Sequence, residues 1–332
     1  MGTVPESMAD ELAAAVRTGD RRALARAITL VESSRREDQP LASRLLQLLT
    51  PRAGHSIRIG ISGVPGAGKS TFIEALGNHI IDQGHRVAVL AVDPSSAISG
   101  GSILGDKTRM ERLARREEAY IRPSPAGRTL GGVARHTRET MLLCEAAGFD
   151  VVLVETVGVG QSETAVADMT DMFLLLLLPG GGDELQGIKR GIVERADYVL
   201  VNKSDGDLQP AATRSAADYG NALRLLQARS RNWEVPVETC SSLDDSGMAA
   251  VWQTIRRFRQ TMTDSGELEG NRARQALAWL WNEMAETLAD ELREDPDMRQ
   301  RIAAIESAVA RGQASPRVAA REMIDIYLQR RH

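Results

Sequence analysis

The chain of 332 residues is poor in the residue types on which several classes of protein depend. Its two cysteines, Cys144 and Cys240, lie far apart in the sequence, so no disulfide framework is expected and a reducing compartment fits. The five histidines are dispersed and form no tract that would bind a transition metal. Aromatic residues make up only 4% of the chain, so the core has to be built mainly from Leu, Ile, Val and Ala.

The chain also has no excess of positive charge. It contains 41 lysines and arginines against 45 aspartates and glutamates, a formal net charge of −4. General binding of DNA or RNA needs cations clustered on one surface. Arginine-rich stretches occur at 112–116 and 256–259, but acidic residues lie nearby, and such mixed stretches are usually solvated helix faces. We therefore expect no nucleic acid as a partner.

Long apolar runs are absent as well. The longest, 172–179, is far shorter than the roughly 20 residues that a helix needs to span a bilayer. Residues 1–15 carry acidic side chains and lack the apolar core of a signal peptide. The sequence therefore predicts a protein without membrane association, located in the cytoplasm.

Short apolar runs alternate with helical stretches between residues 56 and 263. Most of these runs are continuous and do not alternate with polar residues, as is typical of parallel strands that are buried on both faces. A repeated strand–helix order predicts an α/β fold with a doubly wound, mostly parallel sheet. The expected strands are 57–62, 86–92, 120–122, 151–155, 172–178, 198–202 and 237–240.

Helical segments flank this central domain, 56–263, on both sides. Apolar residues recur at helical spacing through residues 1–55, which predicts an N-terminal helical extension. A polar linker at 264–267 opens a C-terminal helical region, 264–332, in which Pro296 ends a long helix. The apolar stripes of these helices are narrow. They can pack on the central domain or pair with another chain, and we favour a dimerisation arm.

A glycine-rich motif follows the first expected strand. Residues 63–70 match the pattern G-x-x-x-x-G-K-[ST] in full, with a strand before them and a helix, 71–83, after them. Such a loop turns backbone N–H groups toward phosphate oxygens, and the helix N-terminus adds its positive dipole end. Lys69 is expected to reach the β- and γ-phosphates, and Ser70 to coordinate Mg²⁺. The predicted phosphate-binding residues are Gly63, Val64, Pro65, Gly66, Ala67, Gly68, Lys69, Ser70 and Thr71.

A second motif indicates which base is bound. Asn202, Lys203 and Asp205 form N-K-x-D after an apolar strand. The Asp205 carboxylate can accept hydrogen bonds from guanine N1–H and the exocyclic amine, which adenine lacks at those positions, so such a site discriminates strongly. The segment Cys240-Ser241-Ser242 is similar to the GTPase loop whose backbone N–H meets guanine O6. The sequence predicts GTP and GDP as ligands.

Acidic residues end two further strands. Asp93 follows the second strand and Glu155 ends the fourth, at the edge of the sheet where ligands of α/β proteins bind. A carboxylate there can hold Mg²⁺ directly or through water. Asp106, in a glycine-rich segment between them, is either a further acidic ligand or the N-cap of the following helix. Gly158, at the end of an E-x-x-G motif, is placed so that its N–H can contact the γ-phosphate.

Residues 180–189 form a loop whose composition suggests movement. Three glycines follow the fifth strand, and Gln186 and Lys189 come after them. These side chains could reach the nucleotide, although a plain connection between strand and helix is also open. Where Ras-like GTPases place a glutamine to orient water, this chain has Val159, and Gln161 comes two residues later. Hydrolysis is therefore expected to be slow without a partner.

Together these motifs resemble the MeaB/ArgK-type G proteins, the family that includes the methylmalonic aciduria type A protein. The resemblance covers nearly the whole chain and implies a homodimeric GTPase of the SIMIBI class. It also implies a chaperone of adenosylcobalamin-dependent methylmalonyl-CoA mutase, in which GTP hydrolysis gates cofactor delivery and protects or reactivates the mutase. The segments that carry the resemblance are 60–70, 92–96, 100–110, 155–163 and 202–205.

The resemblance also implies roles for single residues. In it, loop 180–189 is a third switch that responds to the mutase. Besides Ser70, the Mg²⁺ and switch set that it implies consists of Asp93, Asp106 and Glu155. The expected catalytic residues are Lys69, Glu155, Gln186 and Lys189. The chain has no D-x-H-x-x-G cobalamin signature, so we expect no tight cobalamin site.

Three other functions stay open as alternatives. A nickel metallochaperone GTPase would need a His- or Cys-rich tract, which the chain lacks. A nucleotide-dependent kinase would need an acceptor pocket with a positioned carboxylate base. N-K-x-D and the switch-like loops argue against that reading. A GTP-gated binding module without turnover would use the same nucleotide site, but the complete set of magnesium ligands argues against it.

Overall fold

The computed structural model describes residues 4–33, 35–92, 110–123, 130–156, 162–180, 190–225 and 229–329. The chain divides into two compact units, Met1–Glu269 and Gly270–His332. Each unit is described by itself. No helix in the described ranges is long and apolar enough to cross a membrane.

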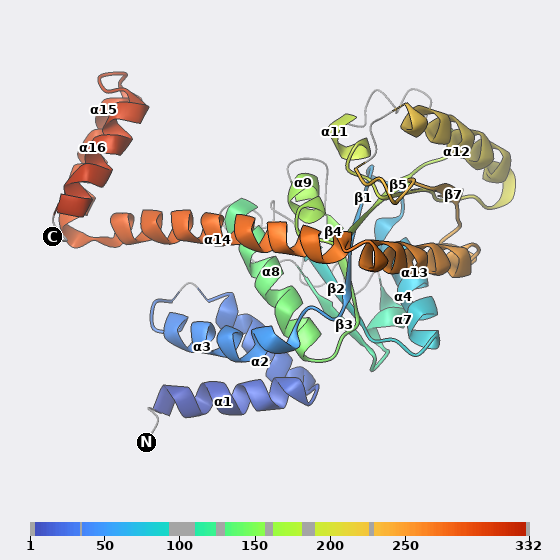
Figure 1. The fold of residues 1–332 in the computed structure, drawn as a ribbon, viewed down its shortest axis with the longest axis horizontal. Helices are drawn as coiled ribbons and strands as arrows, with labels where there is room; N and C mark the ends of the chain where they lie inside the picture. Colours follow the sequence, from blue (N-terminus) through green and yellow to red (C-terminus); the bar gives the residue numbers. More distant parts are fainter. Residues whose placement is uncertain are drawn as a thin grey trace. The chain divides into compact units, whose positions relative to one another are not determined.

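The first unit is built on a seven-stranded sheet in which all the described pairs of strands are parallel (Figure 1). The order across the sheet is β3-β2-β4-β1-β5-β6-β7, so β1 lies near the centre and β7 at one edge. This arrangement confirms the predicted α/β fold with a parallel sheet. The strands are β1 Ile57–Gly63, β2 Val87–Val92, β3 Ala119–Arg122, β4 Val151–Thr156, β5 Met172–Leu177, β6 Tyr198–Val201 and β7 Val237–Thr239.

The central strands are buried along their whole length because helices cover both faces of the sheet. Strands β1, β2, β4, β5 and β6 have no exposed residue. Helices α4 (Lys69–Asp82), α7 (Glu111–Ala114) and α13 (Met248–Asp264) share one apolar core with alternate strand residues, and α8 (Leu130–Ala146) and α9 (Ser162–Ala167) pack on the strands from the other side (Figure 1). Continuous apolar strands therefore form here because both of their faces need covering.

Three helices precede the sheet and belong to the same compact unit. They are α1 (Val4–Arg17), α2 (Arg21–Val31) and α3 (Gln39–Leu49), and all three contact α8. Asp20 begins α2, since its side chain accepts hydrogen bonds from the backbone N–H groups of Arg22 and Ala23 at 2.8 and 2.9 Å. The extension thus packs on α8, the helix that covers one face of the sheet.

The remaining helices of the first unit connect or follow the later strands. They are α11 (Arg190–Val193) and α12 (Gln209–Arg224). Helix α13 ends at Asp264 and α14 (Glu267–Glu294) begins three residues later. The predicted linker 264–267 was therefore too long, because Asp264 and Glu267 both extend helices and only Ser265 and Gly266 lie between them. Gly266 has a positive φ of 72°, which suits the turn between two helices.

The second unit is a small helical assembly. After α14 it contains α15 (Pro296–Ala310) and α16 (Pro316–Gln329). Met298, Met323 and Tyr327 form its buried centre, and the Tyr327 hydroxyl donates a hydrogen bond to Glu291 Oε2 at 3.1 Å. Large apolar side chains on α14 stay exposed: Leu277, Leu280, Trp281, Met284 and Leu288.

A buried ion pair joins β1 to α8 near the amino ends of the strands. Arg58 donates from Nε and Nη2 to the two carboxylate oxygens of Glu145 at 2.8 and 2.9 Å, and both side chains are almost fully buried. Glu145 also accepts hydrogen bonds from Ser56 Oγ and the Gly54 N–H. Burial opposes the charge of Glu145, but the Arg58 guanidinium and the other donors hold its pKa below the usual value.

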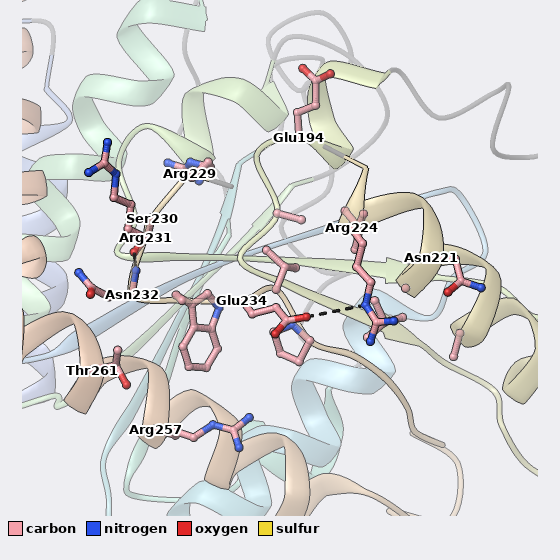
Figure 2. Close-up of a pocket in the computed structure, with 18 of the residues that line it drawn as sticks. Glu194, Asn221, Arg224, Arg229, Ser230, Arg231, Asn232, Glu234, Arg257 and Thr261 are labelled. Carbon is pink, nitrogen blue, oxygen red and sulfur yellow. Dashed lines mark hydrogen bonds and ion pairs between the residues drawn. The ribbon is translucent and has the colours of Figure 1, made fainter. Parts of the chain in front are cut away.

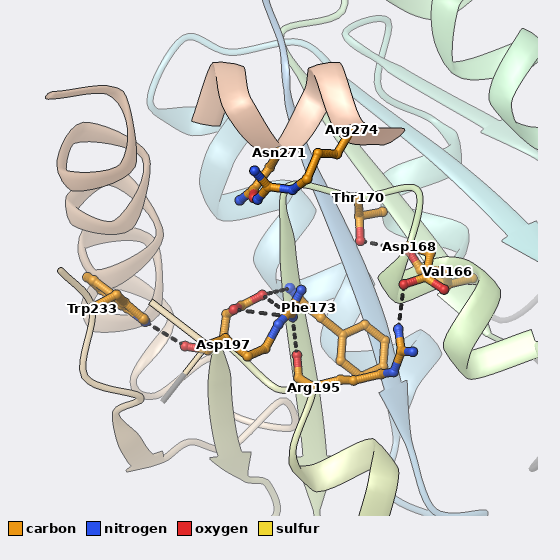
Figure 3. A network of polar contacts seen from close by, with 10 residues as sticks. Val166, Asp168, Thr170, Phe173, Arg195, Asp197, Trp233, Asn271 and Arg274 are labelled. Carbon is orange, nitrogen blue, oxygen red and sulfur yellow. Dashed lines mark hydrogen bonds and ion pairs between the residues drawn. The ribbon is translucent and has the colours of Figure 1, made fainter. Parts of the chain in front are cut away.

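A half-buried carboxylate, Asp197, directly precedes β6 (Figure 3). Asp197 Oδ2 accepts a hydrogen bond from the Phe173 N–H at 2.8 Å and lies 3.4 Å from Arg229 Nη1. The Trp233 indole N–H donates to the backbone carbonyl of Asp197 at 2.8 Å. Burial raises the pKa of Asp197 to about 6, although the Arg229 charge opposes this shift. The amino ends of β5 and β6 are thus joined by part-buried polar contacts.

Candidate nucleotide site

The predicted site segments converge because the sheet is parallel. The glycine-rich loop follows β1, and Glu155 is the second-last residue of β4. Asn202 follows β6, and Cys240 follows β7. The carboxyl ends of parallel strands share one edge, so residues that are far apart in sequence meet there. Strand register brings Glu155 beside Ile61 of β1, at the start of the glycine-rich loop.

The glycine-rich loop joins the end of β1 to the start of α4. Gly66 and Gly68 both have a φ of 82°, a left-handed conformation that suits glycine and turns the backbone tightly. Lys69 begins α4, and its Nζ donates a hydrogen bond to the Gly63 carbonyl at 2.9 Å. Burial lowers the pKa of Lys69, and the nearby charges of Glu155 and Glu163 oppose that shift. The helix begins at Lys69, two residues earlier than the sequence predicted.

Asn202 links the glycine-rich loop to the loop after β7. Its side chain is 1% exposed, and Nδ2 donates to the Ala67 carbonyl at 2.8 Å. Its Oδ1 accepts from the Ser242 backbone N–H at 3.1 Å and from Ser242 Oγ at 2.8 Å. A Cβ on Gly68 would come within 3.0 Å of Asn202 Nδ2, so glycine at 68 allows this close contact. The asparagine of N-K-x-D therefore joins the glycine-rich loop to the loop after β7.

Asp205 is held by the same loop. Ser241 Oγ donates a hydrogen bond to Asp205 Oδ1 at 2.6 Å, and the Ser204 backbone N–H donates to the Cys240 carbonyl at 3.0 Å. Ser241 is fully buried, so its hydroxyl fixes the carboxylate from the protein side. Lys203 takes a positive φ of 57°, which turns the chain between Asn202 and Asp205. Both predicted base-binding segments are thus in direct contact.

Cys240 packs against Asn202, and its thiol is unreactive. The thiol is buried and donates weakly to Asn202 Oδ1 at 3.7 Å. Burial, with a smaller effect of the Glu238 charge, raises the pKa of Cys240 to about 12. The side chain therefore stays a neutral thiol at physiological pH, and redox or nucleophilic chemistry does not follow from its presence.

Ser70 and Glu155 are the described pair that could hold a metal ion. Ser70 Oγ donates to Glu155 Oε1 at 3.0 Å, and Glu155 is 4% exposed. A serine hydroxyl and a carboxylate are oxygen donors of the kind that Mg²⁺ prefers, so the pair fits this ion. In the described ranges no group of three or more His, Cys, Asp and Glu side chains could hold a metal. A complete coordination shell would need further ligands, among them water and phosphate oxygens.

Several predicted site residues lie outside the described residues. Their positions relative to the phosphates therefore stay predictions, as do the roles that depend on those positions. They are Asp93, Asp106, Gly158, Gln186 and Lys189. The remaining predicted residues of the glycine-rich loop are described, with Val64 half-buried and Pro65 and Thr71 exposed.

The structure also brings in residues to which the sequence analysis gave no role. Glu163, in the first turn of α9, is 3% exposed, and Ser62 Oγ lies 3.4 Å from its Oε1. Thr156 Oγ1 donates to Ser62 Oγ at 3.1 Å, and both hydroxyl residues are fully buried. Glu163 is the last residue of segment 155–163, which begins with Glu155. Only the packing of α9 shows that the Glu163 side chain is buried.

A large groove of about 1300 Å³ lies away from these residues (Figure 2). It is lined by α12, α13 and the segments that precede β6 and β7, which places it at the amino ends of those strands. Two of its arginines have partners among the lining residues: Arg224 lies 3.8 Å from Glu234, and Arg257 lies over the Trp233 ring. Size alone therefore does not make this groove the nucleotide site, because it has neither the phosphate-binding loop nor the base-binding loops.

Comparison with known proteins identifies relatives across nearly the whole chain. The family model described as methylmalonyl-CoA mutase-associated GTPase MeaB matches residues 24–297. A protein of Mycobacterium tuberculosis named as a probable GTPase is 53% identical over 317 residues, covering 96% of this chain and 94% of that protein. The mitochondrial methylmalonic aciduria type A homolog of Mus musculus is 49% identical, covering 97% of this chain and 80% of that protein.

Two further comparisons agree with these. The GTPase ArgK of Escherichia coli is 47% identical, and the match covers 93% of each chain. A crystal structure described as a LAO/AO transport system kinase superposes with a TM-score of 0.75 at 39% identity, covering 98% of this chain and all of that one. The matches extend over nearly the full length of the present chain, so they include the regions of the sheet and of the flanking helices.

Proposed function

The chain belongs to the MeaB family of methylmalonyl-CoA mutase-associated GTPases, and from this we propose that its GTPase cycle protects and reloads an adenosylcobalamin-dependent methylmalonyl-CoA mutase. Binding of GTP and GDP and hydrolysis of GTP are the activities of the family. The observation that supports the finer proposal best is the family match over residues 24–297, which covers both the sheet and the start of the helical arm. The mutase is the partner that the family description names.

In this proposal the glycine-rich loop binds the phosphates. Backbone N–H groups of residues 63–70 and the N-terminus of α4 face the phosphate oxygens, and Lys69 exchanges its contact with the Gly63 carbonyl for one with the β- and γ-phosphates. Such positioned charges act mainly by stabilising the negative charge of the transferring phosphoryl group. The link from Ala67 through Asn202 to Ser242 would hold the phosphate and base ends of the nucleotide at a fixed separation.

Ser70 and Glu155 would hold Mg²⁺, with Asp93 and Asp106 as the further acidic residues. When bound, Mg²⁺ supplies positive charge that offsets the charge of the phosphates. The chain's own part is to fix the two oxygen donors, since Ser70 and Glu155 already contact each other at 3.0 Å. Gly158 would contact the γ-phosphate through its N–H, and Gln186 and Lys189 would respond to the mutase and complete the catalytic set with Lys69 and Glu155.

Selectivity for guanine would come from Asp205. Its carboxylate can accept two hydrogen bonds from the guanine edge, while Ser241 fixes it from behind. The backbone of Cys240-Ser241-Ser242 would contact the guanine O6. An adenine nucleotide would leave the carboxylate without its donors in a partly buried site, which is costly.

We further propose that the chain works as a homodimer through its C-terminal region, 264–332. The exposed apolar side chains of α14 support this, because Leu277, Leu280, Trp281, Met284 and Leu288 recur at helical spacing and together would cost free energy in water. Leu280→Glu should then give a monomer in sedimentation velocity, with GTP turnover kept. The exposed Leu225→Glu, outside α14, serves as the matched control and should stay dimeric. A dimer in both variants would contradict the proposal that region 264–332 forms the dimer.

The proposed function predicts that the mutase survives longer in the presence of this protein and GTP. An adenosylcobalamin-dependent mutase is followed through repeated turnover alone, with the wild-type chain plus GTP, and with Lys69→Ala plus GTP. Slower inactivation with the wild type only is expected. Equal inactivation of the mutase in all three mixtures would contradict the proposed protection of the mutase. The chain would remain a GTPase, with a different partner.

A second candidate is a nucleotide-dependent kinase, because the similar solved structure is described as a transport system kinase. The same mixtures distinguish the two with radiolabelled GTP. Label released as free phosphate supports the GTPase cycle. Label transferred to a protein would support the kinase.

A further inference from the structure

Helix α7 is short and packs against α4 (Figure 1). It has only four residues, Glu111–Ala114, and isolated helices that short are not stable in water. Its N-cap residue is Met110, whose side chain makes no capping hydrogen bond. The backbone N–H groups in the first turn of α7 therefore depend on an acceptor from elsewhere in the fold.

Glu74 of α4 supplies that acceptor. Its Oε1 accepts hydrogen bonds from the backbone N–H groups of Arg112 at 2.6 Å and of Leu113 at 3.3 Å. An N-cap residue usually satisfies such donors from the start of the same helix, whereas here the side chain belongs to a neighbouring helix. Glu74 thus caps α7 and fixes it to α4 at the same time.

Apolar packing holds α7 at the same place. Leu113 is fully buried, and a Cβ on Gly77 of α4 would come within 2.9 Å of Leu113 Cδ2. Glycine at 77, three residues after Glu74, therefore allows α7 to approach α4 closely. Met110 is 1% exposed and belongs to the same apolar core as Leu113. The start of α7 is thus held on α4 by a hydrogen-bonded cap and by close packing.

This attachment lies close to the proposed metal site. Ser70, which would hold Mg²⁺, precedes Glu74 by four residues on α4, and side chains so spaced lie on one side of a helix about 6 Å apart. The chain that enters α7 carries Asp106, four residues before Met110. Four residues span at most about 14 Å, so the attachment of Met110 limits where Asp106 can lie. Glu74 therefore fixes one end of the segment that carries a predicted acidic ligand.

Resting on the nucleotide site proposed above, we propose that Glu74 is a positioning residue for Mg²⁺: by capping α7 it fixes the end of the segment from which Asp106 is predicted to reach the ion. Without the cap, α7 would be formed in a smaller fraction of the molecules. The apparent affinity for a ligand falls in proportion to the fraction of protein in the competent state. The free Mg²⁺ needed for turnover should then rise, while the contacts of the glycine-rich loop and of Asp205 with the nucleotide stay the same.

The test is GTP turnover by full-length Glu74→Ala as the concentration of free Mg²⁺ is varied. Losing the cap should raise the Mg²⁺ concentration for half-maximal turnover by about fivefold. The rate at saturating Mg²⁺ should return to within about twofold of the wild type, because excess ligand restores the competent state. The affinity for fluorescent mant-GDP in EDTA should be unchanged, since no metal is bound there.

Glu74→Gln separates the cap from the charge. The glutamine side chain has the same length and keeps an oxygen that accepts from both N–H groups. The Mg²⁺ requirement of this variant should lie within about twofold of the wild type. A rise as large as that in Glu74→Ala would contradict the proposal, because it would show that the hydrogen-bonded cap does not set the effect.

Asp82→Ala is the matched control. Asp82 Oδ1 accepts a hydrogen bond from Arg116 Nη1 at 2.8 Å, so it also joins α4 to the chain around α7, but about two turns farther from Ser70 than Glu74. Its Mg²⁺ requirement should equal that of the wild type. An equal rise in Asp82→Ala and Glu74→Ala would show a general loosening of α7 and would overturn the proposal.

Two other results would also overturn it. One is an unchanged Mg²⁺ requirement in Glu74→Ala. The other is a loss of mant-GDP affinity in EDTA as large as the rise in the Mg²⁺ requirement, because it would show a nucleotide site disturbed independently of the metal. Failure of the wild type to bind mant-GDP with Mg²⁺ present would instead remove the nucleotide site itself.

Discussion

The two ends of the strands both bury charged side chains, but they treat them differently. At the amino ends, Arg58 pairs with Glu145, and Asp197 lies beside Arg229. At the carboxyl ends, Lys69 donates to a backbone carbonyl, and Glu155 accepts from a hydroxyl. Charges at the amino ends therefore meet opposite charges within the protein. The hydrogen-bond partners of Lys69 and Glu155 are instead a carbonyl and a hydroxyl, which the charges of a ligand can replace.

This difference separates residues that stabilise the fold from residues that serve the nucleotide. Removing one member of a buried ion pair leaves the other charge buried and unpaired, which strongly destabilises a protein. Removing a charge that awaits a ligand has little effect on the free protein and often stabilises it slightly. Substitutions at the amino ends should thus change the free energy of unfolding, and those at the carboxyl ends should change nucleotide binding or turnover.

The largest effect is expected for Lys69→Ala. Because the lysine is the cation expected on the β- and γ-phosphates, GTP turnover should fall by at least about a hundredfold. The midpoint of chemical unfolding without nucleotide should stay the same or rise slightly. Arg231→Ala, which removes an exposed cation at the amino-end groove, should turn over GTP like the wild type. Normal turnover in Lys69→Ala would contradict the assignment of the loop.

The converse is expected for Glu145→Ala. It leaves the Arg58 guanidinium buried without its carboxylate and should lower the free energy of unfolding by about 3 to 5 kcal/mol. The KM for GTP of the remaining folded protein should be unchanged. Glu234→Ala breaks a long, exposed ion pair with Arg224 and should cost less than about 1 kcal/mol. Equal losses in the two variants would show that burial of the pair does not matter.

The pH dependence of stability should show the charge of Asp197, whose pKa is raised from 3.8 to about 6. The folded state binds this proton more tightly than the unfolded state, so the contribution to stability is complete below about pH 4 and is lost as the pH rises to about 6. Asp197→Asn does not titrate and should lose no stability in this window. At about 1.4 kcal/mol per pKa unit, wild type and variant should diverge by up to about 3 kcal/mol.

Chemical unfolding of both proteins at pH 4 and at pH 7 measures that divergence. The difference between the two free energies of unfolding should shift in favour of Asp197→Asn at the higher pH. A constant difference at both values would show that Asp197 titrates alike in the folded and unfolded states. GTP turnover at pH 7 should be the same for both, since Asp197 lies at the amino end of β6.

The smallest effect is expected for Ser241→Ala. Its hydroxyl holds Asp205 at 2.6 Å, and losing one such hydrogen bond at a part-buried site should cost about 1 kcal/mol, or about a fivefold rise in the KM for GTP. Ser246→Ala removes the same atom from an exposed serine of the same loop and should leave the KM unchanged. An equal KM in Ser241→Ala and the wild type would show that Asp205 does not need this support.

The same comparison shows what sequence reasoning could reach. Continuous apolar runs predicted the strands closely, as for β5, expected at 172–178 and observed at Met172–Leu177, because burial on both faces leaves a direct composition signal. The glycine-rich and N-K-x-D motifs located the edge of the sheet at which their residues meet. Motif spacing suffices there, since parallel strands carry each motif to the same edge.

Other features depend on packing that the sequence does not express. The burial of Glu163 follows from the close approach of α9 to Gly60. The half-buried position of Asp197 depends on contacts with Phe173 and Trp233, which lie far from it in the sequence. The link from Asn202 to Ala67 and Ser242 joins three loops, so no local pattern predicts it. The extra residues given to the linker between α13 and α14 arose because polar residues such as Asp264 and Glu267 also suit helix ends.

The most direct measurement is steady-state release of phosphate from GTP by the wild-type chain, with and without an adenosylcobalamin-dependent methylmalonyl-CoA mutase. Slow release that the mutase accelerates many-fold is the predicted result, because the chain lacks the glutamine that Ras-like GTPases place after the E-x-x-G position and should need its partner. An unchanged rate over a range of mutase concentrations would contradict the proposed partnership, while leaving the chain a GTPase.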